Sequence, residues 1–272
     1  MKKLAVIMSI YKNDRLIFVK QAIESILAQT YDEFDFYIQY DGPVADDVRS
    51  YIALLDDERI KVQSREENKG LAQSLNDLLA IVMPRGYEYI ARMDADDISM
   101  PERFEKQIIY LDSNKSIDCL GGAIFEIDEN GESRNKTTYY PCTPAEIFAF
   151  FKKRNPIAHP TAVFRKSYFE KIGRFYSLEF ERNEDTMLWY YGLKAGLKIA
   201  NLPYAVLKFR ITDAMFTQRR NGRDFAKSQL QMRKMINNGL NYGFTANLYA
   251  YAMYLLMISP TWLRKWAYKV LR

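Results

Sequence analysis

Cysteine and histidine are scarce in this chain, whose 272 residues contain only Cys119, Cys142 and His159 of these types. The two cysteines lie far apart, without Cys-x-x-Cys or Cys/His ligand spacing, which argues against a disulfide framework and a zinc site. Long apolar runs are also lacking. The run at 4–8 is too short for a signal peptide and has no cleavage site after it, and 244–258 falls short of the roughly 20 residues of a spanning helix. These absences predict a cytosolic protein.

Charge of neither sign dominates the composition. The chain has 39 basic and 34 acidic residues, a formal charge of +5, and is 48% hydrophobic. This length can bury the core of one substantial α/β domain with an appendage. The basic excess gathers near the C-terminus, but no nucleic-acid motif accompanies it, so we expect no nucleic-acid partner.

Apolar runs and helical stripes alternate along the first half of the chain. Helical stripes are expected at 15–29 and 70–82. Buried strands are expected at 4–10, 34–39, 60–63 and 87–93. The alternation predicts an α/β fold with a wound, mainly parallel sheet.

The second half has a less regular pattern. Asp128-Glu129-Asn130-Gly131 predicts a hairpin turn, 183–194 a helix and 198–209 a strand. We therefore expect a catalytic domain at 1–212, with a ligand-binding half at about 1–115 and a second-substrate half at about 116–212. A helical, basic and aromatic region follows at 213–272.

Three acids follow the fourth expected strand, in Asp94-Ala95-Asp96-Asp97. Ligands of wound sheets bind at this edge, and a hard cation such as Mg²⁺ or Mn²⁺, shared with substrate phosphates, relieves the repulsion among carboxylates. Two alternatives stay open. One is a solvated turn before a helix near Pro101, with Ser99 as its N-cap. The other is a hydrolase with an Asp-x-Asp nucleophile, although such a motif is more usual after the first strand.

Motifs spread over most of the chain resemble family-two glycosyltransferases of the GT-A fold, in particular bacterial enzymes of capsule, exopolysaccharide and lipopolysaccharide assembly. Each motif is weak alone, but their order and spacing are specific. They are Ser9-Ile10-Tyr11-Lys12-Asn13, Ser25 to Tyr31, Asp41-Gly42, Asn68-Lys69-Gly70-Leu71-Ala72 with Asn76, Arg92 to Asp97, Pro101 to Phe104, His159-Pro160, and Glu184-Asp185 with Trp189.

The resemblance implies a nucleotide-diphosphate sugar as donor, most simply a UDP-sugar. It implies that Ser9 and Tyr11 line the nucleotide pocket and that Asp41 accepts a hydrogen bond from the uracil ring. It also places Asp94 against the ribose and makes Asp96 a ligand of Mn²⁺ or Mg²⁺. The chain departs from the family pattern around Asp41, because the family usually has two aspartates before the glycine and a serine after it.

Transfer of a sugar also needs a base for the acceptor hydroxyl. The resemblance nominates Asp185, and the first turn of a helix favours an ionised carboxylate. One base opposite the leaving group implies inversion at the anomeric carbon. The alternative for Glu184-Asp185 is ordinary stabilisation of a helix start. Under the resemblance, Glu184 is a candidate for positioning the acceptor.

Three further sets of residues are candidates for substrate contacts. His159 fits either a hydrogen-bonded structural role or contact with acceptor or sugar. Arg210, with Arg219 and Arg220, fits either the diphosphate or a solvated basic loop. The turn at Asn68-Lys69-Gly70 is a helix start whose amides could face phosphate.

The last segment sets Trp262, Leu263, Trp266 and Val270 at helical spacing among basic residues. This pattern predicts a helix in the headgroup region of an anionic membrane, with 244–258 inserting shallowly beside it. A terminal helix packed on the catalytic domain is the alternative.

Together these patterns predict an inverting, metal-dependent glycosyltransferase at the cytoplasmic face of the membrane. Its expected acceptor is a saccharide, lipid-linked, in surface polysaccharide biosynthesis. One rival is a sugar-phosphate nucleotidyltransferase, but the segment from Ser9 to Asn13 lacks the glycine-rich loop expected for a triphosphate. The other rival is a non-catalytic nucleotide-sugar-binding module, which would bind without turnover.

Overall fold

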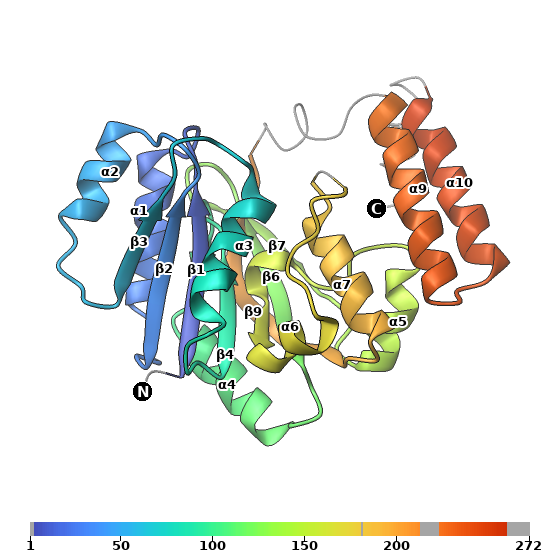
Figure 1. Ribbon diagram of the computed structural model, residues 1–272, viewed down its shortest axis with the longest axis horizontal. Coiled ribbons are helices and arrows are strands. Elements are labelled where there is room, and N and C mark those ends of the chain that lie inside the picture. Colours follow the sequence, from blue (N-terminus) through green and yellow to red (C-terminus); the bar gives the residue numbers. More distant parts are fainter. Residues whose placement is uncertain (1–2, 181, 213–222, 260–272) are drawn as a thin grey trace.

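The computed structural model describes residues 3–180, 182–212 and 223–259. Within these ranges nine strands form one sheet, in the order β3-β2-β1-β4-β8-β6-β9-β5, with β7 paired to β6 (Figure 1). The strands are β1 (Leu4–Ile10), β2 (Phe34–Tyr40), β3 (Ile60–Ser64), β4 (Tyr89–Met93), β5 (Ile98–Ser99), β6 (Cys119–Ile127), β7 (Ser133–Thr138), β8 (Val163–Arg165) and β9 (Ile199–Arg210).

The sheet is mixed and joins two parallel blocks. Strands β3, β2, β1 and β4 run parallel, as do β6 and β9, and β8 lies antiparallel between β4 and β6. The four strands predicted in the first half all form, with ends shifted by at most two residues. The predicted α/β class is confirmed.

Helices cover both faces of the sheet, and two more stand at one end of the molecule. The helices are α1 (Leu16–Leu27), α2 (Asp46–Ala53), α3 (Leu71–Val82), α4 (Arg103–Ser113), α5 (Pro144–Phe151), α6 (Lys166–Ile172), α7 (Glu184–Lys194), α9 (Arg223–Gly239) and α10 (Phe244–Ile258), with a 3₁₀ turn, η1, at His159–Thr161. The predicted turn also forms between β6 and β7, where Gly131 has a positive φ of 86°.

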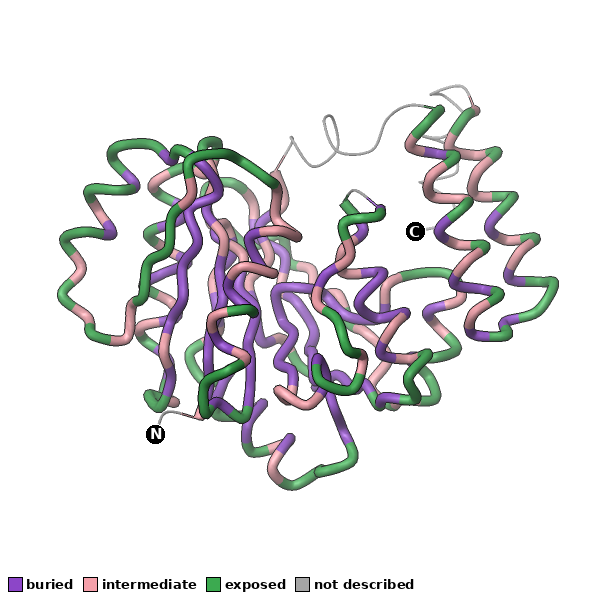
Figure 2. Tube along the Cα trace, viewed as in Figure 1, coloured by how far each residue is buried: buried purple, intermediate pink, exposed green. Residues whose placement is uncertain are grey.

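Two apolar cores result from the alternation of side chains along the strands. Leu4, Val6 and Met8 of β1 pack with α1, α2 and α4, whereas Ala5 and Ile7 pack with α3, α5, α6 and α7. Figure 2 shows the buried residues concentrated along the central strands. Burial on both faces explains why β1 is a continuous apolar run.

The expected N-cap at Ser99 is wrong. Ser99 lies in β5, where it pairs with Leu207 of β9, and α4 begins after Glu102 without a side-chain cap. The acidic turn therefore leads into the sheet before it leads into a helix. This pairing ties the turn to the last strand of the sheet.

Helices α9 and α10 stand beside each other at one end of the molecule (Figure 1). Met232 and Ile236 of α9 join the second core, and Arg233 Nη1 donates to the carbonyl oxygen of Phe151 at 3.1 Å. Tyr242 donates to the carbonyl of Phe148 at 2.7 Å. The pair is thus attached to α5, and the boundary at 212 and 213 stays a prediction.

The predicted membrane helix at 260–272 lies outside the described residues. Arg219 and Arg220, which were candidates for diphosphate contacts, lie outside them too. Among the helices that are described, none combines the length and the apolar character needed to cross a bilayer.

Candidate active site

Three predicted site residues follow neighbouring parallel strands at one edge of the sheet. Tyr11 comes after β1, Asp41 after β2 and Asp94 after β4. Ile10 pairs with Tyr40, and the amide of Asp41 donates to the carbonyl of Ile10 at 2.8 Å. The carboxyl ends of the strands therefore bring these residues together, as expected for a ligand site in a wound sheet.

Asp41 is 3% exposed and is held by the segment before α3. It forms an ion pair with Arg65, and its Oδ1 accepts from the amide of Lys69 at 2.7 Å. The turn at Asn68-Lys69-Gly70, whose amides were candidates for phosphate binding, thus holds the carboxylate of Asp41. Gly42 is required here, because a Cβ at its φ of 76° would lie 2.6 Å from the amide nitrogen of Asn68.

The acidic cluster consists of Asp94, Asp96 and Asp97, which offer carboxylate oxygens within 4.8 Å of one another. Asp97 is 1% exposed, and in the described structure its buried Oδ2 has no hydrogen-bond partner. Burial, followed by the charges of Asp96 and Asp94, raises the pKa of Asp97 well above its usual range. Hard oxygen ligands at this spacing fit Mg²⁺ or Mn²⁺. A cation bound there would also give Asp97 Oδ2 a partner.

Arg92 is a buried cation next to the acidic cluster. A charged residue inside the apolar strand β4 was the sequence feature that could have identified it. Its Nη2 forms an ion pair with Asp94, and its Nε and Nη1 have no partner in the described residues. Burial and the nearby charge of Arg92 lower the pKa of Arg103 to about 9. Two adjacent buried cations thus offset part of the negative charge of the cluster.

Arg210, at the end of β9, holds the acidic turn from the other side. Its amide donates to Asp97 Oδ1 at 2.8 Å, and its Nε donates to the carbonyl of Asp96 at 2.8 Å. Its other nitrogens reach the carbonyls of Asp128 and Glu129 and Oε1 of Gln21. Arg210 is 1% exposed, and its guanidinium bonds to other residues of the protein. Arg210 therefore positions the acidic turn and does not lie on a solvated loop.

Glu184 and Asp185 form the first turn of α7, as the sequence predicts. Asp185 Oδ2 accepts from Nδ2 of Asn155 at 2.8 Å, and its Oδ1 accepts from the amide of Thr186 at 2.6 Å. Asn155 also accepts from the Thr186 hydroxyl at 2.9 Å, which fixes its amide orientation. The Asp185 carboxylate is thus held in one orientation by a residue that the sequence analysis did not identify.

Glu184 differs from its neighbour in its electrostatic state. Burial, followed by the charge of Asp185, raises the pKa of Glu184 to about 7, and Arg92 opposes that shift. Asp94 also contributes to the shift. The start of α7 and the acidic cluster therefore act on each other electrostatically, although they come from opposite halves of the chain.

His159 is 8% exposed and lies in the aromatic core next to the site. Its Nε2 is 2.9 Å from the hydroxyl oxygen of Tyr176, and its ring packs edge-on against Trp189. Burial, with the charge of Arg92, lowers the pKa of His159 well below its usual range. These contacts agree with the hydrogen-bonded structural role, in which a neutral imidazole packs beneath the site.

Comparison with known sequences assigns the family, because residues 5–173 match the family described as Glycosyl transferase family 2. The chain belongs to that family. It is 32% identical over 235 residues to the amylovoran biosynthesis glycosyltransferase AmsE of Erwinia amylovora, covering 85% of this chain and 84% of that protein. It is 28% identical to the Escherichia coli UDP-Gal:alpha-D-GlcNAc-diphosphoundecaprenol beta-1,3-galactosyltransferase, covering 84% and 81%.

Among solved structures, the S. aureus TarS 1–349 complex with UDP-GlcNAc superposes with a TM-score of 0.65 at 16% identity. The match covers 88% of this chain and 70% of TarS 1–349. At that identity the likeness shows the fold alone. The predicted GT-A fold and the predicted family are confirmed, and this family-two protein is a glycosyltransferase.

Proposed function

We propose that this glycosyltransferase moves a sugar from a UDP-sugar to a saccharide acceptor, with inversion and with the help of a divalent cation. The observation that carries the proposal is the cluster of Asp94, Asp96 and Asp97, with its orphaned carboxylate oxygen, at the carboxyl edge of the sheet. The acidic start of α7 acts electrostatically on the same region. One group of acids suits a cation with a diphosphate, and the other suits a base.

On the donor side, Ser9 and Tyr11 line the nucleotide pocket and Asp41 accepts a hydrogen bond from the uracil ring. Asp94 contacts the ribose, and Asp96 would hold Mn²⁺ or Mg²⁺. Support comes from the edge of the sheet that Tyr11, Asp41 and Asp94 share. The UDP donor in the name of the E. coli galactosyltransferase and the UDP-GlcNAc bound by TarS point to the same class of donor.

On the acceptor side, Asp185 takes the proton of the attacking hydroxyl. The hydroxyl oxygen forms its bond to the anomeric carbon as the bond to the diphosphate oxygen breaks, and the nucleoside diphosphate leaves with that electron pair. Attack from the face opposite the leaving group inverts the anomeric centre. A bound divalent cation would neutralise the charge that develops on the diphosphate.

Residues around the carboxylates support this chemistry. Asn155 and the amide of Thr186 orient the Asp185 carboxylate. Glu184, whose pKa is raised to about 7 by burial, positions the acceptor, and Arg210 holds the carbonyl of Asp96 and so the turn that carries the metal ligands. His159 packs beneath the site through Tyr176, without direct contact with the reacting atoms.

The acceptor in this proposal is a lipid-linked saccharide of surface polysaccharide biosynthesis, elongated at the cytoplasmic face of the membrane. The names of two relatives support this class, since one acts in amylovoran biosynthesis and the other on a diphosphoundecaprenol-linked sugar. The acceptor hydroxyl would enter from the side of α7, where the base lies.

The proposal is tested with a panel of nucleotide sugars, Mn²⁺ or Mg²⁺, and membrane lipid extract as acceptor, following release of the nucleoside diphosphate. We expect release from one UDP-sugar that needs the acceptor, stops with chelator and returns when the cation is restored. Asp96→Asn should lose this activity, and Asp46→Asn, in the first turn of α2, should keep it. Turnover that survives complete removal of divalent cations would exclude the metal-dependent mechanism.

A further inference from the structure

Helix α10 carries a row of large apolar side chains that face away from the protein. Phe244 is 80% exposed, Leu248 58%, Tyr251 44%, Leu255 61% and Ile258 40%. Their spacing of four and three residues places them on one side of the helix along its whole length. We call these five residues the α10 apolar face. Single exposed apolar residues are common on protein surfaces, whereas a contiguous exposed apolar patch of this kind marks a site of interaction.

The opposite side of α10 packs on the protein, and the apolar face is exposed in the part of the chain that the structure describes. Ala246 and Ala250 are each 5% exposed, and their small side chains allow close approach. Nδ2 of Asn237 on α9 donates to Oδ1 of Asn247 at 3.0 Å, which fixes the rotation of α10 about its axis. The five large side chains are therefore held outward by the packing on their far side.

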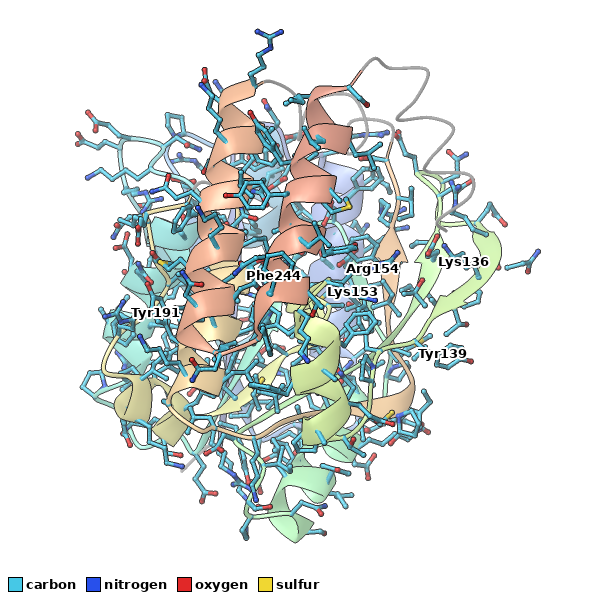
Figure 3. All side chains as sticks on the ribbon, turned by 90° about the vertical axis from the view of Figure 1, so that its right-hand side faces the viewer. Lys136, Tyr139, Lys153, Arg154, Tyr191 and Phe244 are labelled. Atoms are coloured by element: carbon cyan, nitrogen blue, oxygen red, sulfur yellow. The ribbon has the colours of Figure 1, made fainter. Side chains whose placement is uncertain are left out.

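Lysines border the α10 apolar face on both sides, whereas α10 itself contains no charged residue. On the α9 side, Lys234 Nζ lies 5.6 Å from the ring centroid of Tyr251, and Lys227 precedes it on the same side of α9. On the α5 side, Lys153 Nζ lies 5.8 Å from the ring of Tyr249. In Figure 3 Phe244, Lys153 and Arg154 lie on the face turned toward the viewer.

Lys152 completes this border, with Nζ 5.3 Å from the ring of Tyr242. Among the described residues, none of Lys152, Lys153, Lys227 and Lys234 forms an ion pair with an acid. An apolar stripe with long cationic side chains along its edges matches the boundary between acyl chains and anionic headgroups.

We propose that the α10 apolar face docks on an anionic lipid bilayer, with α10 parallel to the membrane plane and Lys152, Lys153, Lys227 and Lys234 against the headgroups. The parallel orientation follows because the stripe runs from the first to the last residue of the helix. This proposal gives a surface to the membrane location stated above. Its test measures lipid binding alone, so it stands or fails separately from the transfer reaction.

A second copy of the chain fits this face less well. In a two-fold dimer the same patch meets itself, so the lysine rows of both copies would come together without acids to pair with them. Like charges opposed across an interface disfavour association. An anionic lipid surface offers complementary charge to all four lysines at once.

The test is flotation of the full-length protein with two kinds of vesicle, phosphatidylglycerol mixed with phosphatidylcholine, and phosphatidylcholine alone. We expect binding to the anionic vesicles to be at least about tenfold stronger, since each basic residue near such a surface strengthens binding about fivefold. The double variant Leu248→Glu/Leu255→Glu and the double variant Lys227→Glu/Lys234→Glu should each lose at least about tenfold of this binding.

Matched controls lie on the opposite end of the protein. Leu54→Glu, at an 83% exposed leucine after α2, and Lys61→Glu, at an exposed lysine of β3, should bind vesicles as the unchanged protein does. Circular dichroism melts of all variants separate loss of binding from loss of folding. Equal binding to both vesicles, or wild-type binding by folded Leu248→Glu/Leu255→Glu, overturns the proposal. So does a dimer in solution that this double variant abolishes, because it assigns the face to a second copy.

Discussion

The amide of Arg210 donates a 2.8 Å hydrogen bond to Oδ1 of Asp97, joining the last residue of β9 to the acidic turn after β4. The side chain adds a second link, through its Nε, to the carbonyl of Asp96. Through both links Arg210 holds the turn that carries the carboxylates of the proposed metal site, although Arg210 is not itself a metal ligand. The orientation of those ligands should therefore depend on Arg210.

Arg210→Lys should weaken cation binding, because lysine keeps the charge but cannot reach the carbonyls of Asp96 and Asp128 and Gln21 together. We expect a loss of about 10–100-fold in Mn²⁺ affinity, as for other residues that orient metal ligands. Titration calorimetry with Mn²⁺ in the presence of UDP measures it. Lys208→Met, on the same strand, should leave the affinity unchanged. A variant Arg210→Lys that binds Mn²⁺ normally would remove Arg210 from this role.

Asp185→Asn should abolish transfer while UDP binding persists, because the amide can still accept from the Thr186 backbone but cannot take a proton. General bases contribute about 10²–10⁴-fold, so the loss in kcat should be at least about 100-fold. Steady-state kinetics with UDP binding by calorimetry separate the two effects. A turnover equal to that of the unchanged enzyme would show that another group accepts the proton.

Asn155→Ala tests the support of the same carboxylate. Removing the 2.8 Å hydrogen bond to Asp185 Oδ2 frees the side chain to adopt other orientations. We expect kcat to fall about tenfold or more, with the KM for the donor little changed, since the proposed mechanism places the donor on the other side of the site. A rise in the donor KM at constant kcat would instead place Asn155 in donor binding.

Glu184 predicts a specific pH dependence of stability. Its pKa of about 7 in the folded protein, raised by burial, exceeds the value near 4.3 of an exposed glutamate. The folded state therefore binds this proton more tightly than the unfolded state, so the contribution of Glu184 to stability is fully present below about pH 4 and is lost as pH rises to about 7. In metal-free buffer, Glu184→Gln should remove about 1–3 kcal/mol of this decline. Parallel pH profiles of urea unfolding for the two proteins would contradict the prediction.

Gly192→Ala should destabilise the fold. An added Cβ would lie 2.0 Å from the hydroxyl oxygen of Tyr168, a fully buried residue that donates to the carbonyl of Leu188. Alanine favours a helix by about 1 kcal/mol over glycine, but overpacking of a core costs about 1–3 kcal/mol and here displaces a buried hydrogen bond. We expect a net loss of about 1–2 kcal/mol in denaturant unfolding. Tyr168→Phe should recover part of the loss in the double variant.

The sequence was sufficient for the parts of the site that lie next to strands. Tyr11, Asp41 and Asp94 each follow an apolar run, and a wound sheet brings the ends of such runs to one edge. Arg92 was visible as a charge inside a buried strand, but its ion pair with Asp94 was not. Local patterns predict which residues lie at an edge, and they do not specify which side chains meet there.

Contacts between distant segments were beyond the sequence. Arg65 reaches Asp41, and Asn155 reaches Asp185, through loops whose paths depend on tertiary packing. Local sequence was also misleading at Ser99, since a serine shortly before a proline, here Pro101, is typical of a helix start. Pairing with Leu207 placed it in a strand instead, because the tertiary contact outweighs the local preference.

The link between Asp97 and Arg210 spans 113 residues of chain, and this has a consequence for biosynthesis. At about 5–20 residues per second, a ribosome needs about 5–25 s to proceed from one to the other. During that interval the emerging strands can pair, but the carboxylates have no anchor from β9. The newly made polypeptide therefore gains the anchored geometry of its proposed cation site only once β9 has been made, after the segments that contribute to the acceptor side have been synthesised.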